Sequence, residues 1–364
     1  MRSSVIRGLL FVACIGVINL GSVIANPANG DGVIERNNAA PEMAIEDTDF
    51  ADMAEEPITF PDATWQVRSP AEVGLDVAKL QELSASVRGA GAIVRDGYMV
   101  YNWGNQNSRT WQAWSSASKA VISTMLLFAI NEGRIIGPYE PVRPYVQQQF
   151  PGHDLVNKDI PMSFFHLANA ESGYALPEAP SNAWAYSDYA FKLYKYLVFG
   201  QLFGARPTDA SQVAAAITAP ARLGPLQFED GSLVKIVKGG PRWNGTLRDT
   251  ARLAWFWLNK GRWKAQQLLP RTLFDTYVKA QVPANLPRSR SHQPNDYLGV
   301  GTDGDTDPNV TPTNPHYGFN WNYNLGTDGS LKVSGAPADL FFAQGNGNKF
   351  IVMVPSQNLV AGWG

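Results

Sequence analysis

The chain has 364 residues, of which 45% are hydrophobic, 11% aromatic and 17% charged. This length and composition describe a globular protein of one large or two small domains and exclude a disordered or fibrous chain. The net charge of −2 gives no strong field for nucleic acid or an anionic membrane. The single cysteine, Cys14, excludes an internal disulfide framework and a thiolate metal cluster.

The first 25 residues have the pattern of a secretory signal peptide. Arg2 and Arg7 precede an apolar run that ends in the small-residue pattern Val23-Ile24-Ala25. Two alternatives stay open: a lipoprotein, with Phe11-Val12-Ala13 before Cys14, and a retained membrane anchor. We expect cleavage after Ala25, no stable membrane span in the mature chain, and a secreted or periplasmic location.

Residues 26–62 form an acidic segment in which ten carboxylates face one basic side chain, Arg36. This composition predicts a disordered tether. Residues 63–364 then carry a net charge near +5 and form the folded domain.

The folded domain begins with three clear local patterns. Apolar spacing predicts a helix over Asp76–Val87, with Leu75, Val77, Leu80 and Leu83 as its buried stripe. Asp96-Gly97 supplies the tight turn of a β-hairpin over residues 92–103. A helix that is apolar on all sides runs from Ser116 to about residue 130 and stops before Gly133, so we expect it to be buried at the centre of the fold.

Residues 138–290 have mostly helical patterns, with helices expected at Met162–Ala170, Tyr186–Phe199, Ala210–Ala219 and Leu247–Asn259. The chain closes with strand-like runs at residues 340–343, 350–354 and 359–360. Strands therefore stand at both ends of a helical block. We predict an α+β fold, in which an antiparallel sheet built from both termini is flanked by helices and carries a mostly helical inserted subdomain.

Catalysis by a Ser-His-Asp triad is not supported. The four histidines, His153, His166, His292 and His316, are scattered, and none lies beside a Gly-x-Ser-x-Gly elbow. The Ser-x-x-Lys pattern occurs twice, and about one or two copies are expected by chance in a chain of this length. Context separates the copies: Ser232–Lys235 lies in a strand-like run, whereas Ser116–Lys119 opens the long buried helix.

At the start of a helix, a lysine three residues after a serine lies on the same face, within reach of the hydroxyl. Burial can leave the Lys119 amine uncharged, or its proton shared, so that it can act as the base for Ser116. The helix N-terminus would favour the negative charge that develops on an attacked carbonyl oxygen.

These residues, with two further segments, resemble the motifs of the serine β-lactamase and penicillin-binding-protein superfamily, in particular its class C branch and related esterases. The segments are Tyr186-Ser187-Asp188 and the closing run from Ala336 to Val360, and they follow in the order that the family uses. The resemblance extends from about Trp65 to the C-terminus. It implies a β-lactamase-like fold and a serine hydrolase that forms an acyl-enzyme without a metal or organic cofactor.

The resemblance also implies roles for individual residues. Ser116 would be the nucleophile, Lys119 its base, and Tyr186 the relay that protonates the leaving group. The backbone N–H of Ser116 and one N–H of the Gly345–Lys349 strand would form the oxyanion hole. The residues implied in substrate binding are Trp184, Asp188, Asn346, Gly347, Asn348 and Lys349.

Three departures from the family pattern affect this interpretation. Asn346 precedes Gly347 where the family usually has Lys or His, which disfavours a substrate carboxylate and favours an esterase or amidase. Asp188 replaces an asparagine and adds a negative charge, unless Lys119 or another cation neutralises it. Family members usually have a C-terminal helix after the last strand, whereas the sequence ends at Gly364, so either it is truncated or another element covers that sheet face.

The sequence thus predicts an exported serine hydrolase that acts on an ester, amide or lactam bond of a small or peptide-like substrate. The alternatives are a non-catalytic binding protein that keeps the fold, and a cell-wall D,D-peptidase or β-lactamase. No nucleic-acid partner is expected, and the sequence leaves the oligomeric state open.

Overall fold

The computed structural model describes residues 58–87, 89–104, 109, 111–231, 233–237, 240–289, 294–302 and 315–364. The predicted signal peptide, most of the predicted tether, Ser232 and His292 lie outside these residues. Among the described residues, no helix has the length and apolarity needed to cross a membrane.

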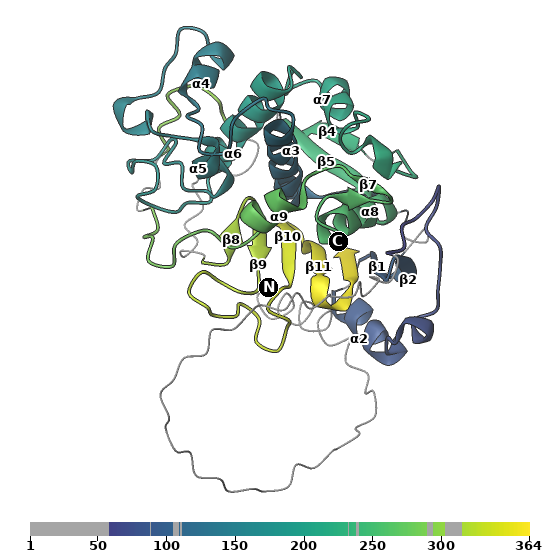
Figure 1. Ribbon diagram of the computed structural model, residues 1–364. Helices are drawn as coiled ribbons and strands as arrows, with labels where there is room; N and C mark the ends of the chain where they lie inside the picture. Colours follow the sequence, from purple (N-terminus) through teal and green to yellow (C-terminus); the bar gives the residue numbers. More distant parts are fainter. Residues whose placement is uncertain are drawn as a thin grey trace, which may run out of the picture.

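The centre of the fold is a seven-stranded sheet with the order β2-β1-β12-β11-β10-β9-β8 (Figure 1). Neighbouring strands pair antiparallel, and Gly91 at the start of β1 lies opposite Trp363 at the end of β12. The prediction of an antiparallel sheet built from both termini is confirmed. The strands are β1 (Gly91–Arg95), β2 (Tyr98–Trp103), β8 (Tyr317–Gly318), β9 (Trp321–Tyr323), β10 (Phe341–Gly345), β11 (Lys349–Val354) and β12 (Leu359–Trp363).

The first hairpin forms for the predicted reason. Asp96 and Gly97 have φ angles of 51° and 82°, a left-handed pair that closes a two-residue turn between β1 and β2. Asn358, at the turn before β12, donates its side-chain N–H to Asp96 Oδ1 at 2.8 Å. The two ends of the chain are therefore joined at the turns as well as along the strands.

Helices cover both faces of the sheet. One face packs against α3 (Lys119–Asn131) and α8 (Leu247–Leu258), which share a large apolar cluster with β10, β11 and β12. The other face packs against α2 (Val77–Val87) and residues 333–340. The buried residues of α2 are Leu80, Leu83 and Val87. Val77 is 43% exposed, so the prediction that it belongs to the buried stripe is wrong.

The region between the terminal strands is mostly helical, as predicted, but it also contains strands that the patterns did not show. A three-stranded sheet has the order β3-β5-β4, and β6 pairs with β7. The predicted helix over Tyr186–Phe199 is divided into α6 and a π-helical segment, η4. The remaining bounds are β3 (Trp111–Ala113), β4 (Leu233–Val237), β5 (Gly240–Thr246), β6 (Arg262–Trp263), β7 (Gln266–Gln267), α4 (Arg143–Gln149), α5 (Phe164–Ala168), α6 (Asp188–Lys195), α7 (Ala210–Ile217), α9 (Arg271–Tyr277), η1 (Ala71–Val73), η2 (Ser115–Ser118), η3 (Asn157–Asp159), η4 (Tyr196–Leu202), η5 (Gly224–Leu226) and η6 (Pro355–Gln357). The second Ser-x-x-Lys copy runs into β4, as its strand-like pattern predicts.

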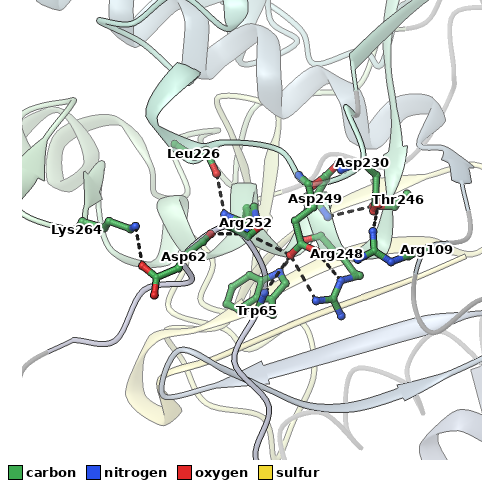
Figure 2. Close-up of polar contacts among 12 residues, drawn as sticks. Asp62, Trp65, Arg109, Leu226, Asp230, Thr246, Arg248, Asp249, Arg252 and Lys264 are labelled. Atoms are coloured by element: carbon green, nitrogen blue, oxygen red, sulfur yellow. Dashed lines mark hydrogen bonds and ion pairs between the residues drawn. The ribbon is translucent and has the colours of Figure 1, made fainter.

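The last residues of the predicted tether belong to the folded domain. Phe60 is buried, and its ring packs edge-on against Trp255 and Trp263, with centroid distances of 6.4 and 5.3 Å. The side chain of Arg252 on α8 donates to the carbonyl oxygens of Asp62 and Leu226, at 2.9 Å each (Figure 2). Residues 58–62 are therefore packed against α8, and the boundary predicted at residue 62 lies too far along the chain.

A buried carboxylate organises the polar contacts around the start of α8. Glu229, whose side chain is 2% exposed, accepts hydrogen bonds from Arg248 Nε at 2.9 Å and Arg252 Nη2 at 3.1 Å. It also accepts from the backbone N–H of Trp65 at 3.1 Å. One carboxylate thus connects the N-terminal segment, α8 and the loop before β4.

Replacing this carboxylate should destabilise the fold strongly. The variant Glu229→Ala leaves two buried guanidinium groups without their carboxylate, which should lower the free energy of unfolding by about 3–5 kcal/mol. The matched control is Lys264→Ala, since Lys264 forms an exposed ion pair with Asp62 (side chains 43% and 75% exposed) and should contribute about 1 kcal/mol or less. Urea denaturation measures both, and equal effects of the two substitutions would contradict the assignment.

Candidate active site

Strand β5 fixes the turn that carries Ser116. Trp114, fully buried, donates its backbone N–H to the carbonyl oxygen of Trp243 and its indole N–H to that of Gly245, both at 3.2 Å. Ser118 Oγ donates to the same Trp243 oxygen at 3.3 Å. Both ends of the short helix η2 are therefore bound to β5, and Ser116 lies between them.

Strand β10 passes directly against this turn. A Cβ atom on Gly345 would lie 2.3 Å from the carbonyl oxygen of Trp114 and 3.3 Å from the backbone nitrogen of Ala117. A side chain at position 345 would therefore push the strand away from η2, which only glycine avoids. This close approach brings the end of β10 beside Ser116.

The buried amine of Lys119 joins the groups of the candidate site. Its Nζ lies 2.9 Å from Ser116 Oγ and 3.0 Å from Asp188 Oδ1. The same nitrogen lies over the rings of Tyr186 and Phe191, at 4.7 and 4.6 Å from their centroids. The structure thus brings together Ser116, Lys119, Tyr186 and Asp188 from two segments, the start of α3 and the start of α6.

The pKa of Lys119 is shifted in the direction opposite to the one that burial alone gives. Burial by itself lowers the pKa of this amine, but the charges of Tyr186 and Asp188, with hydrogen bonds to both, outweigh it and raise the pKa above its usual value. The sequence analysis named Asp188 as a possible partner of Lys119, and the structure places the two 3.0 Å apart. A raised pKa favours the ammonium form of Lys119, which pairs with the Asp188 carboxylate at 3.0 Å.

A cationic Lys119 changes what the site can do. As an ammonium it donates to Ser116 Oγ and stabilises negative charge on that oxygen, but it has no free lone pair with which to take the serine proton. The attraction between Lys119 and Tyr186 that raises the lysine pKa exists only when the phenol oxygen is negative.

Two predicted binding residues lie outside the immediate contacts of Ser116. Trp184 is 2% exposed and packs edge-on against Tyr317, with ring centroids 5.9 Å apart. Tyr317 packs in turn against the ring of Tyr186, so Trp184 supports Tyr186 through Tyr317. Lys349 stands opposite Gly345 in the β10–β11 register, and burial and the nearby charge of Arg242 lower its pKa.

Asn346, Gly347 and Asn348 form the turn between β10 and β11. Asn346 Oδ1 accepts from the backbone N–H of Gly347 at 2.8 Å, and Asn348 Nδ2 donates to the carbonyl oxygen of Val87 at the end of α2, at 3.1 Å. The side chain of Asn348 is therefore bound to α2 and is not brought to Ser116.

The glycine that contacts the nucleophile turn is Gly345, whereas the sequence analysis centred the third motif on Gly347. Side chains alternate along a strand, so Ala343 lies on the same face of β10 as Gly345. Ala343 is fully buried in the cluster that contains α3. At positions 343 and 345, β10 therefore presents no charged side chain to η2.

Several contributors to the site were not predicted. Gly345 is one of several glycines in its run and is distinguished only by its neighbours in space. Phe191 was detectable, because it follows Asp188 by three residues and so lies on the same helix face. His166 has a structural contact instead: its Nδ1 accepts a hydrogen bond from the backbone N–H of Ser163, at the start of α5, at 3.0 Å.

Within the described part of the chain, His, Cys, Asp and Glu side chains do not gather into a group of three or more that could hold a metal ion.

Comparison with known proteins identifies the family of the chain. The model of the Beta-lactamase family matches residues 77–363. The chain belongs to the Beta-lactamase family. The predicted membership of the serine β-lactamase and penicillin-binding-protein superfamily and the β-lactamase-like fold are both confirmed. No curated protein matches the sequence.

Solved structures share the fold at low sequence identity. A candidate β-lactamase from Bacteroides dorei has a TM-score of 0.56 and 16% identity over 79% of this chain and 90% of its own. A candidate 6-aminohexanoate-dimer hydrolase from Bacillus anthracis has a TM-score of 0.53 and 14% identity, covering 78% of this chain and 75% of its own. An octameric penicillin-binding protein homologue from Pyrococcus abyssi has a TM-score of 0.51 and 14% identity, covering 79% and 73%.

A buried carboxyl group lies in the segment that supports Tyr186. Ala185, next to Tyr186, donates its N–H to the carbonyl oxygen of Ala170, and Glu171 follows. Glu171 is 3% exposed, and within the described structure its Oε1 has no hydrogen-bond partner. Burial raises the pKa of Glu171 to about 7.

This carboxyl group should make stability fall as the pH rises. Above pH 4.5 the unfolded chain releases the Glu171 proton, whereas the folded protein holds it until about pH 7, so folding loses about 3 kcal/mol across this range. Glu171→Gln should match the wild type near pH 4.5 and exceed its free energy of unfolding by about that amount at pH 8. Urea denaturation at several pH values measures the difference, with Glu82→Gln, exposed on α2, as the control. A Glu171→Gln curve parallel to that of the wild type would contradict the shift.

Proposed function

We propose that this protein is a serine hydrolase that forms an acyl-enzyme on Ser116 and cleaves an ester or amide bond. The observation that carries the proposal is the contact of one buried ammonium with both Ser116 Oγ and Asp188, at 2.9 and 3.0 Å, beside the ring of Tyr186. Membership of a family of serine acyl-transfer hydrolases supports it.

In the acylation step, the Tyr186 phenolate takes the proton of Ser116 while Lys119 stabilises the serine oxygen. Ser116 Oγ attacks the carbonyl carbon, and the resulting oxyanion receives hydrogen bonds from the N–H of Ser116 and an N–H of the segment after Gly345. The bond to the leaving group then breaks as Tyr186 returns the proton to the leaving oxygen or nitrogen.

In the deacylation step, a water molecule attacks the acyl carbon and gives a proton to Tyr186. The ester bond to Ser116 breaks, the serine oxygen regains a proton from Tyr186, and the acid is released. Asp188 keeps Lys119 charged throughout, so the ammonium is available to stabilise the serine oxygen in both steps.

The uncharged residues of β10 that face η2 favour a substrate without a carboxylate next to the reacting bond. The strand turns Ala343 and Gly345 toward η2, and neither offers a charge to an anionic group. This supports an ester or a neutral amide over a carboxylated lactam. The activities named for the structural neighbours, which include a 6-aminohexanoate-dimer hydrolase and a β-lactamase, do not select the bond at 14–16% identity.

Export is part of the proposal and rests on the first 25 residues. Arg2 and Arg7, the apolar run and Val23-Ile24-Ala25 support cleavage after Ala25 and a secreted or periplasmic mature protein. N-terminal sequencing of the protein from the growth medium or the periplasm tests this separately from the chemistry.

Covalent labelling tests the proposed reaction. A fluorophosphonate should form an adduct on the peptide that contains Ser116 in the wild type and in Ser232→Ala, but not in Ser116→Ala. A chromogenic short-chain ester should be hydrolysed with the same dependence on Ser116, faster than a chromogenic cephalosporin. Mass spectrometry of the labelled peptide and a colorimetric assay make the two measurements.

The possible outcomes separate the alternatives. Folded wild-type protein that remains unlabelled would indicate a binding protein that keeps the fold without turnover. Labelling with faster hydrolysis of the cephalosporin would indicate a β-lactamase or D,D-peptidase. An adduct on a residue other than Ser116 would contradict the assignment of Ser116 as the nucleophile.

A further inference from the structure

A cavity of about 400 Å³ lies where the end of α8, the helix α9 and the strands β9 and β10 meet (Figure 1). Phe341, at the start of β10, lines this cavity, whereas Gly345, at the other end of the strand, contacts η2. Four residues of extended strand span about 13 Å. The cavity is therefore separate from the candidate active site.

The wall of the cavity is apolar and largely aromatic. Six of its side chains are at most 8% exposed: Trp257, Leu258, Phe274, Tyr323, Leu340 and Phe341. The indole N–H of Trp257 already donates to Thr124 Oγ1 at 2.9 Å. The hydroxyl of Tyr323 already donates to the carbonyl oxygen of Gly318 at 3.2 Å. The wall therefore suits an apolar group, as in most small-molecule sites.

Four charged side chains also line the cavity, namely Lys260, Lys279, Asp275 and Asp339. Asp275 lies 2.5 Å from Lys260 Nζ and 3.8 Å from Arg271 Nε. Asp339 accepts hydrogen bonds from the backbone N–H and the hydroxyl of one serine, at 2.5 and 2.9 Å.

Lys279 differs from these three groups. It is exposed, and among the residues that the structure describes no carboxylate forms an ion pair with it. Its ammonium can therefore pair with an anionic group of a molecule in the cavity, whereas the carboxylates of Asp275 and Asp339 already accept hydrogen bonds.

We propose that this cavity binds a small carboxylic acid with an apolar, aromatic body. The carboxylate pairs with Lys279, and the body lies among the aromatic side chains of the wall. An amine in the same place would meet the positive charges of Lys260 and Lys279, which disfavours a cation. The site is independent of acyl transfer at Ser116.

The volume sets the size of the ligand. An apolar cavity of about 150 Å³ holds one benzene molecule, so this cavity has room for a phenyl ring and a short chain. The probe is 4-phenylbutyrate, in which a methylene chain joins a phenyl ring to a carboxylate. A ligand of about twelve heavy atoms should bind with a Kd of about 1 mM.

Nuclear magnetic resonance of the protein labelled with ¹⁵N-tryptophan locates the binding. Trp257 lies in the cavity wall and Trp114 precedes the nucleophile, and each indole signal is identified by its loss in Trp257→Phe or Trp114→Phe. Adding 4-phenylbutyrate should shift the Trp257 signal in a saturable way and leave the Trp114 signal in place. Ser116→Ala should bind the probe as the wild type does.

The amide of the same acid, 4-phenylbutyramide, tests the role of Lys279. The wild type should bind the acid about fivefold more tightly than the amide, and Lys279→Met should bind the two equally. The matched control is Lys264→Met, which removes another exposed lysine, outside the cavity, and should keep the fivefold preference.

A cavity-filling variant tests the location. Val278→Phe places a larger side chain in the cavity and should abolish the shift of Trp257. Ala338→Phe, at an exposed position of the lining, serves the same purpose if Val278→Phe does not fold. A shift that persists in a folded filled variant would place the ligand elsewhere and overturn the inference.

Three further results would overturn it. The first is a Trp257 signal that does not move at about 20 mM probe, well above the expected Kd. The second is equal binding of acid and amide by the wild type. The third is a shift of Trp114 in place of Trp257, which would assign the probe to the candidate active site. Since Ser116→Ala retains the cavity, failure of the proposed reaction leaves this inference standing, and the reverse also holds.

Discussion

The site depends on the ion pair between Lys119 and Asp188. A charged amine that is 7% exposed is costly to bury unless a carboxylate lies beside it. Here the partner comes from a segment 69 residues further along the chain, so the pair joins the start of α3 to the start of α6. Tyr186 stands two residues before Asp188, and Ser116 three before Lys119. The interaction that neutralises the lysine therefore also assembles the nucleophile and the proposed base.

The surrounding scaffold supplies rigidity from the backbone. Strand β5 holds η2 through the carbonyl oxygens of Trp243 and Gly245, and Gly345 lets β10 approach η2 from the other side. These contacts involve main-chain atoms, which no side-chain pattern reveals. Glu229 and its arginines in turn hold the start of α8, directly after β5. The position of Ser116 thus depends on the backbone contacts of η2 with β5 and β10, and on the buried ion pairs of Glu229 at the start of α8.

The sequence was informative wherever a local pattern determines the structure. The Asp96-Gly97 turn, the all-apolar helix after Ser116 and the final strands follow from turn chemistry and periodicity, and all are present. The helical block concealed β3, β4 and β5, because these short strands are defined by pairing between distant segments. Motif resemblance gave the family and four residues that the structure brings together.

What the sequence did not predict depends on neighbours in space. Spacing identified the amine of Lys119 but not the direction in which its neighbours shift its pKa, which depends on the positions of Tyr186 and Asp188. The choice between Gly345 and Gly347 required the position of the Trp114 carbonyl oxygen.

The charge of Lys119 in the resting protein is the most direct test of this account. Nuclear magnetic resonance of the protein labelled with ¹⁵N-lysine reports the protonation state of each amine, and the Lys119 signal is identified by its loss in Lys119→Met. The account predicts an ammonium at pH 7 and at pH 9, with a lower titration midpoint in Asp188→Asn. A neutral amine at pH 7 in the wild type would contradict it and restore Lys119 as the base.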